Sequence, residues 1–256
     1  MTYEKLTRAG LVGALALLGA VGLAGGAGAA DIEVAAGVVE VAEDGQCSLI
    51  EALENANGDA EHDDCMAGDD GLDTVLPASG SVYTLTVAHN VVEDPSSSPC
   101  LGLSQNGLPV ITSPVTVRGQ GATIERSKAV GTPEFRMFQI EASGELTVER
   151  LTLRHGRALL RSDGTGTHGG AICNAGGELR VRDSVLSDNS AAGNGGGIDN
   201  TGVATVSGST LSDNSTGGRG GGIRNTGTLT MDNSTLTHLL QSSERSNSFE
   251  MGSELA

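Results

Sequence analysis

Carboxylate side chains are the groups in this sequence that could most directly do chemistry on a polymer. Two adjacent pairs, Asp63-Asp64 and Asp69-Asp70, lie in the acidic segment Gly58–Gly71. Hydrolysis of a sugar polymer needs two carboxylates facing each other across a groove, and a lyase needs an Arg or Lys base beside carboxylates that hold Ca²⁺. Both pairs lie beside an expected helix rather than on a repeating strand. A solvated acidic loop is therefore the favoured interpretation, and Ca²⁺ is the one cofactor this segment could attract.

The histidines offer no second route to a catalytic or metal site. Their spacing matches no metal-ligand pattern, and the five are scattered along the chain: His62, His89, His155, His168 and His238. Sugar-binding grooves commonly present aromatic rings, but no aromatic residue occurs between Phe138 and Phe249. We therefore assign no catalytic, cofactor-binding or metal-binding residue. A carbohydrate-active enzyme, a polysaccharide lyase or hydrolase, is kept as the alternative to a non-catalytic protein.

A repeat of 25 residues organises the second half of the chain. The block GGGIDNTG at Gly195–Gly202 returns as GGGIRNTG at Gly220–Gly227, an earlier copy begins at His168, and degenerate forms occur further upstream. Within each unit, apolar and polar residues alternate in three short runs that Gly, Asn, Asp and Ser separate, which is typical of short strands and turns. The repeat predicts an all-β fold, a parallel β-helix (a solenoid) of about 25-residue coils over residues 114–238.

Stacked coils would place equivalent residues side by side in ladders. A buried aliphatic ladder is expected from Ile172, Ile198 and Ile223. An amide ladder at a turn is expected from Asn174, Asn200 and Asn225. On the outside, Asp199 and Arg224 would form an exposed ion pair worth no more than about 1 kcal/mol. Asp188 and Asp213 would point into water, because stacked like charges repel each other. Asn214 and Asn233, each of which lies in an Asn-x-Thr sequence, are interpreted as turn residues.

Charge and the N-terminus place the expected protein outside the cytoplasm. The formal net charge of −17 excludes binding to nucleic acid or anionic lipid through a general electrostatic field. Residues 1–30 have the pattern of a signal peptide: Lys5 and Arg8 precede the apolar stretch Leu11–Leu23, and Ala27–Ala30 offers small residues for cleavage near Asp31. That stretch is short for a membrane span, so no span is expected in the mature chain.

The segment Cys47–Gly58 is the one convincing helix of the mature chain. Ser48 and Glu51 form a capping box, and apolar residues follow at helical spacing. Such a helix would cover the open first coil of a solenoid.

Four cysteines in an exported chain favour disulfides over metal or redox sites. Cys47 and Cys65 enclose a short segment, and we predict a disulfide between them that would hold the helix in place. Cys100 lies in a Pro/Ser-rich loop and Cys173 on the expected coil surface. For these two the sequence leaves open whether each is free or bonded to the other.

The motif CSLIEALENAN, followed by DTVLPASGSVYTLT, resembles the start of CSLREA-domain proteins, with Ile50 where that motif has Arg. The later segments GLPVITSPVTVRGQGATIER, GGAICNAGGELRV and GGGIDNTG resemble right-handed parallel β-helix repeat proteins, including those with polymorphic outer-membrane-protein-like repeats. The resemblance implies an exported or surface-exposed β-helix of the right-handed form. It supplies no catalytic residues.

The sequence therefore predicts four regions: a signal peptide (residues 1–30), a CSLREA-like N-terminal cap region (31–113), the β-helix repeats (114–238) and a non-repetitive, disordered tail (239–256). The expected protein is secreted, or associated with the cell surface or outer membrane. Its expected role is structural, adhesive or partner-binding, and the partner is a surface glycan or a protein of unknown identity.

Overall fold

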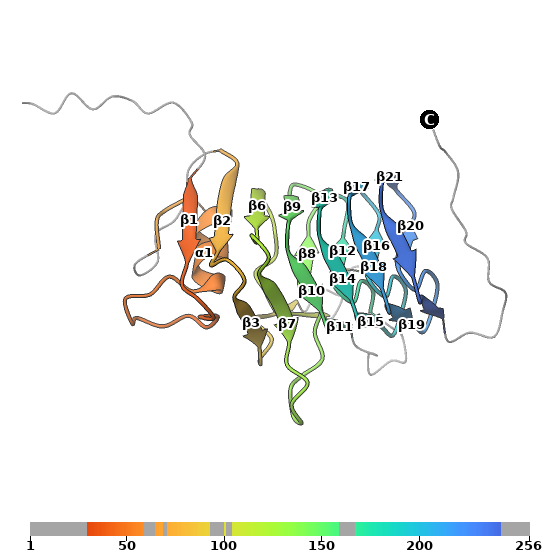
Figure 1. Cartoon of the computed structure of the whole chain (residues 1–256), viewed down its shortest axis with the longest axis horizontal. Helices are drawn as coiled ribbons and strands as arrows, with labels where there is room; N and C mark the ends of the chain where they lie inside the picture. Colours follow the sequence, from red (N-terminus) through yellow and green to blue (C-terminus); the bar gives the residue numbers. More distant parts are fainter. Residues whose placement is uncertain are drawn as a thin grey trace, which may run out of the picture.

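A computed structural model describes residues 30–58, 65–68, 71–92, 100, 104–158 and 167–241. Strands in parallel sheets dominate these residues, with one α-helix, α1 (Leu49–Gly58), at one end (Figure 1). The prediction of an all-β chain built from parallel strands is confirmed. Of the expected signal peptide only Ala30 lies within the described residues, and most of the expected tail lies outside them.

The largest sheet has seven parallel strands, whose order in space follows their order in the chain. Its strands are β1 (Asp31–Val34), β2 (Asp73–Pro77), β6 (Pro114–Arg118), β9 (Glu145–Glu149), β13 (Glu178–Arg182), β17 (Val203–Ser207) and β21 (Thr228–Asp232). Every second side chain of the central strands points inward and is fully buried, as Val115 and Leu146 illustrate. This alternation is why the sequence forms strands here.

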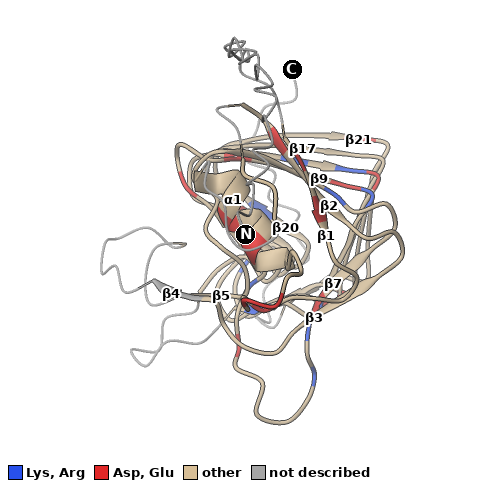
Figure 2. Ribbon diagram, turned by 90° about the vertical axis from the view of Figure 1, so that its left-hand side faces the viewer, with Lys and Arg blue, Asp and Glu red and all other residues tan. Residues whose placement is uncertain are grey.

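A six-stranded parallel sheet and two four-stranded parallel sheets complete the body. The six-stranded sheet contains β3 (Val82–Leu85), β7 (Thr123–Arg126), β10 (Thr152–Arg154), β14 (Val185–Ser187), β18 (Thr210–Ser212) and β22 (Thr235–Thr237). The β8–β20 sheet contains β8 (Phe138–Ile140), β12 (Ile172–Asn174), β16 (Ile198–Asn200) and β20 (Ile223–Asn225). The β11–β23 sheet contains β11 (Arg157–Ala158), β15 (Ser190–Ala191), β19 (Ser215–Thr216) and β23 (Leu240–Gln241). An antiparallel pair, β4 (Asn90–Val92) and β5 (Ser104–Asn106), lies beside this body (Figure 2).

From β8 onward each repeat contributes four strands rather than the three expected, one to each sheet. The additional strand is the two-residue pair Ser190–Ala191 in one repeat and Ser215–Thr216 in the next, which pair in register. Asn214, expected to be a turn residue, is fully buried just before this strand. Its amide donates to the carbonyl of Leu186 at 2.8 Å, which fixes the corner from the inside.

The two expected ladders lie in register in the β8–β20 sheet. Ile172, Ile198 and Ile223 are paired across β12, β16 and β20, and the first two are fully buried. The amide of Asn174 donates to Oδ1 of Asn200 at 2.7 Å, and Asn200 donates in turn to Asn225 at 2.6 Å. A residue spacing of 25 or 26 therefore corresponds to one step between neighbouring strands.

Helix α1 covers the end of the sheets at β1 and β2 (Figures 1 and 2). Its capping box is formed as expected: Ser48 Oγ accepts the Glu51 amide at 3.2 Å, and Glu51 Oε2 accepts the Ser48 amide at 2.9 Å. Strands β2 and β3 already continue the two largest sheets, although the repeats were expected to begin at residue 114. The sheets therefore begin inside the expected cap region.

The repeat extends slightly beyond its expected end at His238. Leu240 and Gln241 form β23 and pair with Ser215 and Thr216, and the Leu240 amide donates to the carbonyl of Asn214 at 3.0 Å. Leu240 and Gln241 thus belong to the last described repeat rather than to the tail. Residues 242–256, expected to be disordered, lie outside the described residues.

Candidate functional site

The carboxylate pairs first considered for catalysis, Asp63-Asp64 and Asp69-Asp70, lie outside the described residues. The described histidines are each close to one carboxylate: His89 to Glu54, His155 to Glu125, His168 to Asp199 and His238 to Asp213. In only one of these pairs, His168 and Asp199, is the carboxylate fully buried. This pair is therefore the centre of the candidate site.

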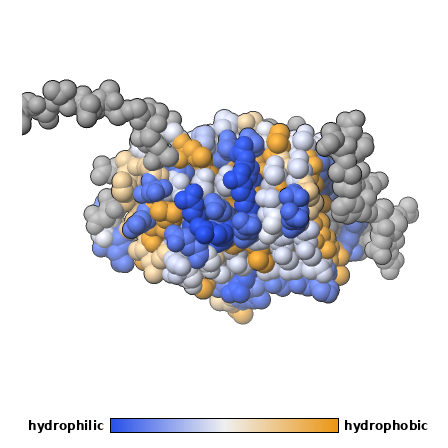
Figure 3. All heavy atoms as spheres, turned by 45° about the horizontal axis from the view of Figure 1, so that its top comes forward, coloured by the Kyte–Doolittle hydropathy of each residue, from blue (hydrophilic) through white to orange (hydrophobic). Residues whose placement is uncertain are grey.

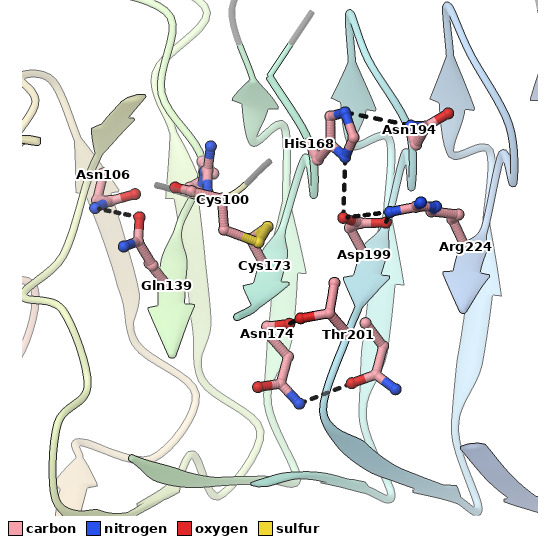
Figure 4. The surroundings of a disulfide bond; sticks show 12 residues. Cys100, Asn106, Gln139, His168, Cys173, Asn174, Asn194, Asp199, Thr201 and Arg224 are labelled. Carbon is pink, nitrogen blue, oxygen red and sulfur yellow. Dashed lines mark hydrogen bonds and ion pairs between the residues drawn. A yellow bond between two sulfur atoms is a disulfide. The ribbon is translucent and has the colours of Figure 1, made fainter. Parts of the chain in front are cut away.

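Asp199 lies in the middle of β16, between the inward-pointing Ile198 and Asn200. Its side chain points to the opposite face of the β8–β20 sheet, as strand alternation requires. One carboxylate oxygen lies 3.1 Å from Nη1 of Arg224, which is the register neighbour of Asp199 on β20. The other carboxylate oxygen lies 3.0 Å from Nδ1 of His168 (Figure 4).

The expected Asp199–Arg224 pair is therefore present, but the expectation that it is exposed is wrong. The Asp199 side chain is 0% exposed and that of Arg224 is 25% exposed. Cys173, expected on the coil surface, is also fully buried. The reason is that Cys100, which is fully buried itself, is bonded to Cys173, the register neighbour of Asp199 on β12. The disulfide thus covers the outer face of this sheet.

The imidazole of His168 contacts the next repeat through both of its nitrogens. Nδ1 faces Asp199, and Nε2 lies 3.2 Å from the amide nitrogen of Asn194. Oδ1 of Asn194 accepts the backbone amide of Arg219 at 2.8 Å, which orients the Asn194 side chain with its amide donors toward the ring. His168 therefore fits the tautomer that donates from Nδ1 to the carboxylate and accepts at Nε2.

A second arginine, Arg136, carries a charge inside the protein next to this group. Its side chain is completely buried, and Nη1 donates to the carbonyl of Cys100 at 3.2 Å. Burial lowers the pKa of Arg136 to about 10, and the charge of Asp199 opposes that shift. Arg136 therefore remains a cation at neutral pH. Its Nε and Nη2 atoms have no hydrogen-bond partner among the described residues, so Asp199 is its main electrostatic compensation there.

We call Arg136, His168, Asn194, Asp199 and Arg224 the Asp199 cluster. A carboxylate beside an imidazole is also found in nucleophilic active sites, where the second ring nitrogen faces a hydroxyl or thiol. Here Asn194 occupies that position, and both nearby cysteines are oxidised. The cluster therefore links β16 and β20 to the Cys100 residue through charge and hydrogen bonds, and the disulfide links β12 to it.

The other disulfide joins Cys47 to Cys65, the pairing expected from the sequence. It connects the residue before the capping box of α1 to the short segment Cys65–Gly68. Asn55 on the same helix donates to the carbonyl of Met66 at 3.0 Å. The disulfide and this hydrogen bond hold the helix against the first strands.

Charged residues on the outer face of the seven-stranded sheet occur as pairs across neighbouring strands. Arg180 on β13 contacts Glu145 on β9 and also Glu178 on its own strand, and Arg118 on β6 lies 3.2 Å from Glu149 on β9. Figure 3 shows hydrophilic residues gathered across the middle of the visible surface. Each of these carboxylates is matched by an arginine, so they do not form the opposed, solvent-facing pair that hydrolysis of a glycosidic bond needs.

Two shallow hollows lie along the β11–β23 sheet. One has a volume of about 200 Å³ and is lined by Glu134, Arg157 and residues of β11 and β15, and the other, about 440 Å³, is lined by residues of β15, β19 and β23. In the first hollow, Glu134 lies 3.0 Å from Arg157. Glu134 is the one carboxylate among the lining residues of the two hollows.

Sequence reasoning missed the participation of His168, Asn194 and Arg136. The signal for the first two was present, because His168, Asn194 and Arg219 each lie four residues before an isoleucine of the aliphatic ladder. Alignment of the repeats would therefore have placed them in one row. The glycine that follows each of them has a positive φ angle, and a Cβ at Gly195 would come within 2.3 Å of the Ile198 carbonyl oxygen. Alignment of the repeats gives no corresponding signal for the participation of Arg136.

No family model, curated protein or solved structure matches the chain. Among the described residues, no helix is long and apolar enough to cross a bilayer. The likeness to CSLREA-domain and β-helix repeat proteins thus stays a hypothesis based on the quoted motifs.

Proposed function

We propose that the chain is an exported module, secreted or held at the cell surface or outer membrane, with a structural, adhesive or partner-binding role. Its fold would be a right-handed parallel β-helix with an N-terminal cap of the CSLREA kind. Four parallel sheets whose strands recur in the same order along the chain support this architecture. Two disulfides fit an oxidising compartment outside the cytoplasm.

The observation that carries the proposal is a regular, uncharged row of hydroxyl groups on the six-stranded sheet. Leu186 and Leu211 of this sheet are fully buried, so the residues on either side of each point outward. Over the last three described coils the outward positions are mostly hydroxyl residues. We call these residues the hydroxyl face: Ser187, Thr210, Ser212, Thr235 and Thr237.

The hydroxyl face suits a partner that is itself rich in hydroxyl groups. Neighbouring parallel strands lie about 4.8 Å apart, so the face repeats donors and acceptors at short, fixed intervals. It carries no charge, whereas the chain as a whole has a formal charge of −17. A neutral surface glycan could therefore contact this face without having to overcome repulsion between like charges. The neutral glycan is the partner that we favour over a protein.

Binding to a glycan array tests this proposal with two matched double variants. Thr210→Lys with Thr235→Lys changes the hydroxyl face, while Thr205→Lys with Thr230→Lys makes the same change in the same coils on the seven-stranded sheet. We expect the first variant to lose at least tenfold in affinity for the bound glycan, and the second to keep the wild-type affinity. Equal losses in both variants, or no glycan bound by the wild-type protein, would contradict the proposal.

A further inference from the structure

Ala30 is held by the folded body through its backbone and its side chain. Its backbone nitrogen donates to Oδ1 of Asp73 at 2.9 Å, and its carbonyl accepts the amide of Thr74 at 2.7 Å. Its methyl group packs against the hydrophobic core. Ala30 thus extends β1 by one position along β2, one residue closer to the N-terminus than the strand itself.

Asp73 places a carboxylate inside the protein at this point. Its side chain is 0% exposed, and its register neighbour on β6 is Val115, which is buried in the core. The backbone of Gly68 lies close to the other carboxylate oxygen of Asp73: a Cβ at position 68 would come within 2.7 Å of Oδ2. The inward carboxylate therefore lies between the backbone of Gly68 and the nitrogen of Ala30.

A signal-peptidase cleavage motif ends at Ala29, directly before the residue that contacts Asp73. Ala27-Gly28-Ala29 has small residues at the first and third positions, which is the A-x-A pattern recognised by signal peptidases. We propose that the chain is cleaved between Ala29 and Ala30, and that the new α-ammonium group of Ala30 binds Asp73 inside the folded protein. This inference rests on the proposed export. It moves the end of the expected signal peptide from residue 30 to residue 29.

The chemistry of the step is a simple hydrolysis. Water adds across the Ala29–Ala30 peptide bond: its oxygen goes to Ala29, which leaves as a carboxylate, and its two protons go to the nitrogen of Ala30, which becomes an ammonium group. The N–H group that faces Asp73 then belongs to a cation, so attraction between opposite charges is added to the hydrogen bond at the same position. Processing would in this way place a cation beside a buried carboxylate.

Cleavage one residue later would remove contacts that the fold makes. Asp73 would lose the donor that Ala30 supplies, and the Thr74 amide would lose its acceptor. The new terminus would be Asp31, whose own carboxylate is exposed and adjacent to the ammonium group. The structure therefore favours retention of Ala30 in the mature protein.

The cleavage point is tested by the intact mass of the protein that a bacterial host exports when the chain carries its own residues 1–29. A mass that begins at Ala30 supports the inference, and a mass that begins at Asp31 or at any other residue overturns it. A chain that stays uncleaved inside the cell contradicts both the proposed export and the proposed cleavage. With that outcome, the interaction between the Ala30 ammonium group and Asp73 is tested by the next experiment alone.

The pair is tested without export by releasing the chain from an N-terminal fusion with a protease that leaves no extra residue. One form starts at Ala30 and a control form starts at Gly28, and both are made with and without Asp73→Asn. We expect Asp73→Asn to reduce the folding equilibrium constant at least tenfold more in the Ala30 form than in the Gly28 form. An equal reduction in both forms overturns the pair.

A second readout covers the case in which Asp73→Asn fails to fold. An amine-reactive reagent should label the α-amino group of the wild-type Ala30 form at least tenfold more slowly than that of the Gly28 form, because the ammonium group is partly buried and bound to Asp73. Equal labelling rates overturn the pair even if the cleavage point is correct.

Discussion

Replacing Asp199 by Asn should destabilise the protein far more than the loss of a surface ion pair. The substitution keeps the shape of the side chain but removes the charge that faces Arg136, which is fully buried and has a pKa of about 10, and Arg224, which is 25% exposed. Loss of one partner of a buried charge pair costs roughly 3–5 kcal/mol, because the remaining charge stays buried without compensation. In a chain of this size each kcal/mol lowers the thermal midpoint by roughly 2–4 °C. A fall of about 6–20 °C is therefore expected.

Urea unfolding of Asp199→Asn beside Arg157→Gln measures this effect against a matched control. Arg157 also makes an ion pair, with Glu134 at 3.0 Å, but its side chain is 57% exposed. Its removal should cost less than about 1 kcal/mol. If Asp199→Asn costs no more than Arg157→Gln, the Asp199 cluster is solvated and the account of the buried face is wrong.

Three further predictions concern the disulfide, a histidine and the repeat. Replacing Cys100 and Cys173 together by Ser should lower the free energy of unfolding in urea by about 4 kcal/mol, because their disulfide spans 73 residues. The same change at Cys47 and Cys65, which are 18 residues apart, should cost about 3 kcal/mol. A smaller cost for the longer loop would argue against the covering role of Cys100. Burial, Lys128 and Arg154 lower the pKa of His155 below 6.5, so its contribution to stability is present above pH 6.5 and is lost as the pH falls through the folded-state value. The free energy of unfolding should therefore fall more between pH 7.5 and 5 in the wild type than in His155→Asn. Asn is chosen because it tolerates the positive φ angle at this position. Identical pH profiles would show that His155 is not the source of the pH dependence. Deleting the 25 residues 201–225 removes one whole repeat and should leave a folded protein with a smaller urea m-value. Deleting only 12 of these residues breaks the repeat and should prevent folding. Circular dichroism during a urea titration distinguishes the two results.

The sequence was sufficient to predict the parallel strands, the residues that stack in the aliphatic and amide ladders, and the helix at Cys47–Gly58. Each of these depends on a pattern within the repeat or within ten consecutive residues, such as the capping box of Ser48 and Glu51. The strand Ser215–Thr216 was missed because two residues are too few to show alternation. The early strands β2 and β3 were missed as members of the large sheets because they do not resemble the later repeats.

The candidate site was only partly predictable, for a different reason. The 25-residue register correctly made Asp199 and Arg224 neighbours, since it fixes which residues lie on adjacent strands. Burial of Asp199 depends instead on Cys100, which approaches from 73 residues before Cys173. Nothing in the periodicity of the coils encodes that covering segment, so the pair was expected to be exposed.

The proposed role as a surface module without a catalytic site can be tested most directly by incubating the purified, disulfide-bonded protein with a panel of plant, bacterial and animal polysaccharides. Release of reducing ends and of unsaturated sugar products is measured with and without Ca²⁺. The proposed non-catalytic role predicts no release above a heat-unfolded control on any polymer, including the glycan that we propose for the hydroxyl face. Ca²⁺-dependent release of unsaturated products, or release of reducing ends, would contradict it and establish a carbohydrate-active enzyme instead.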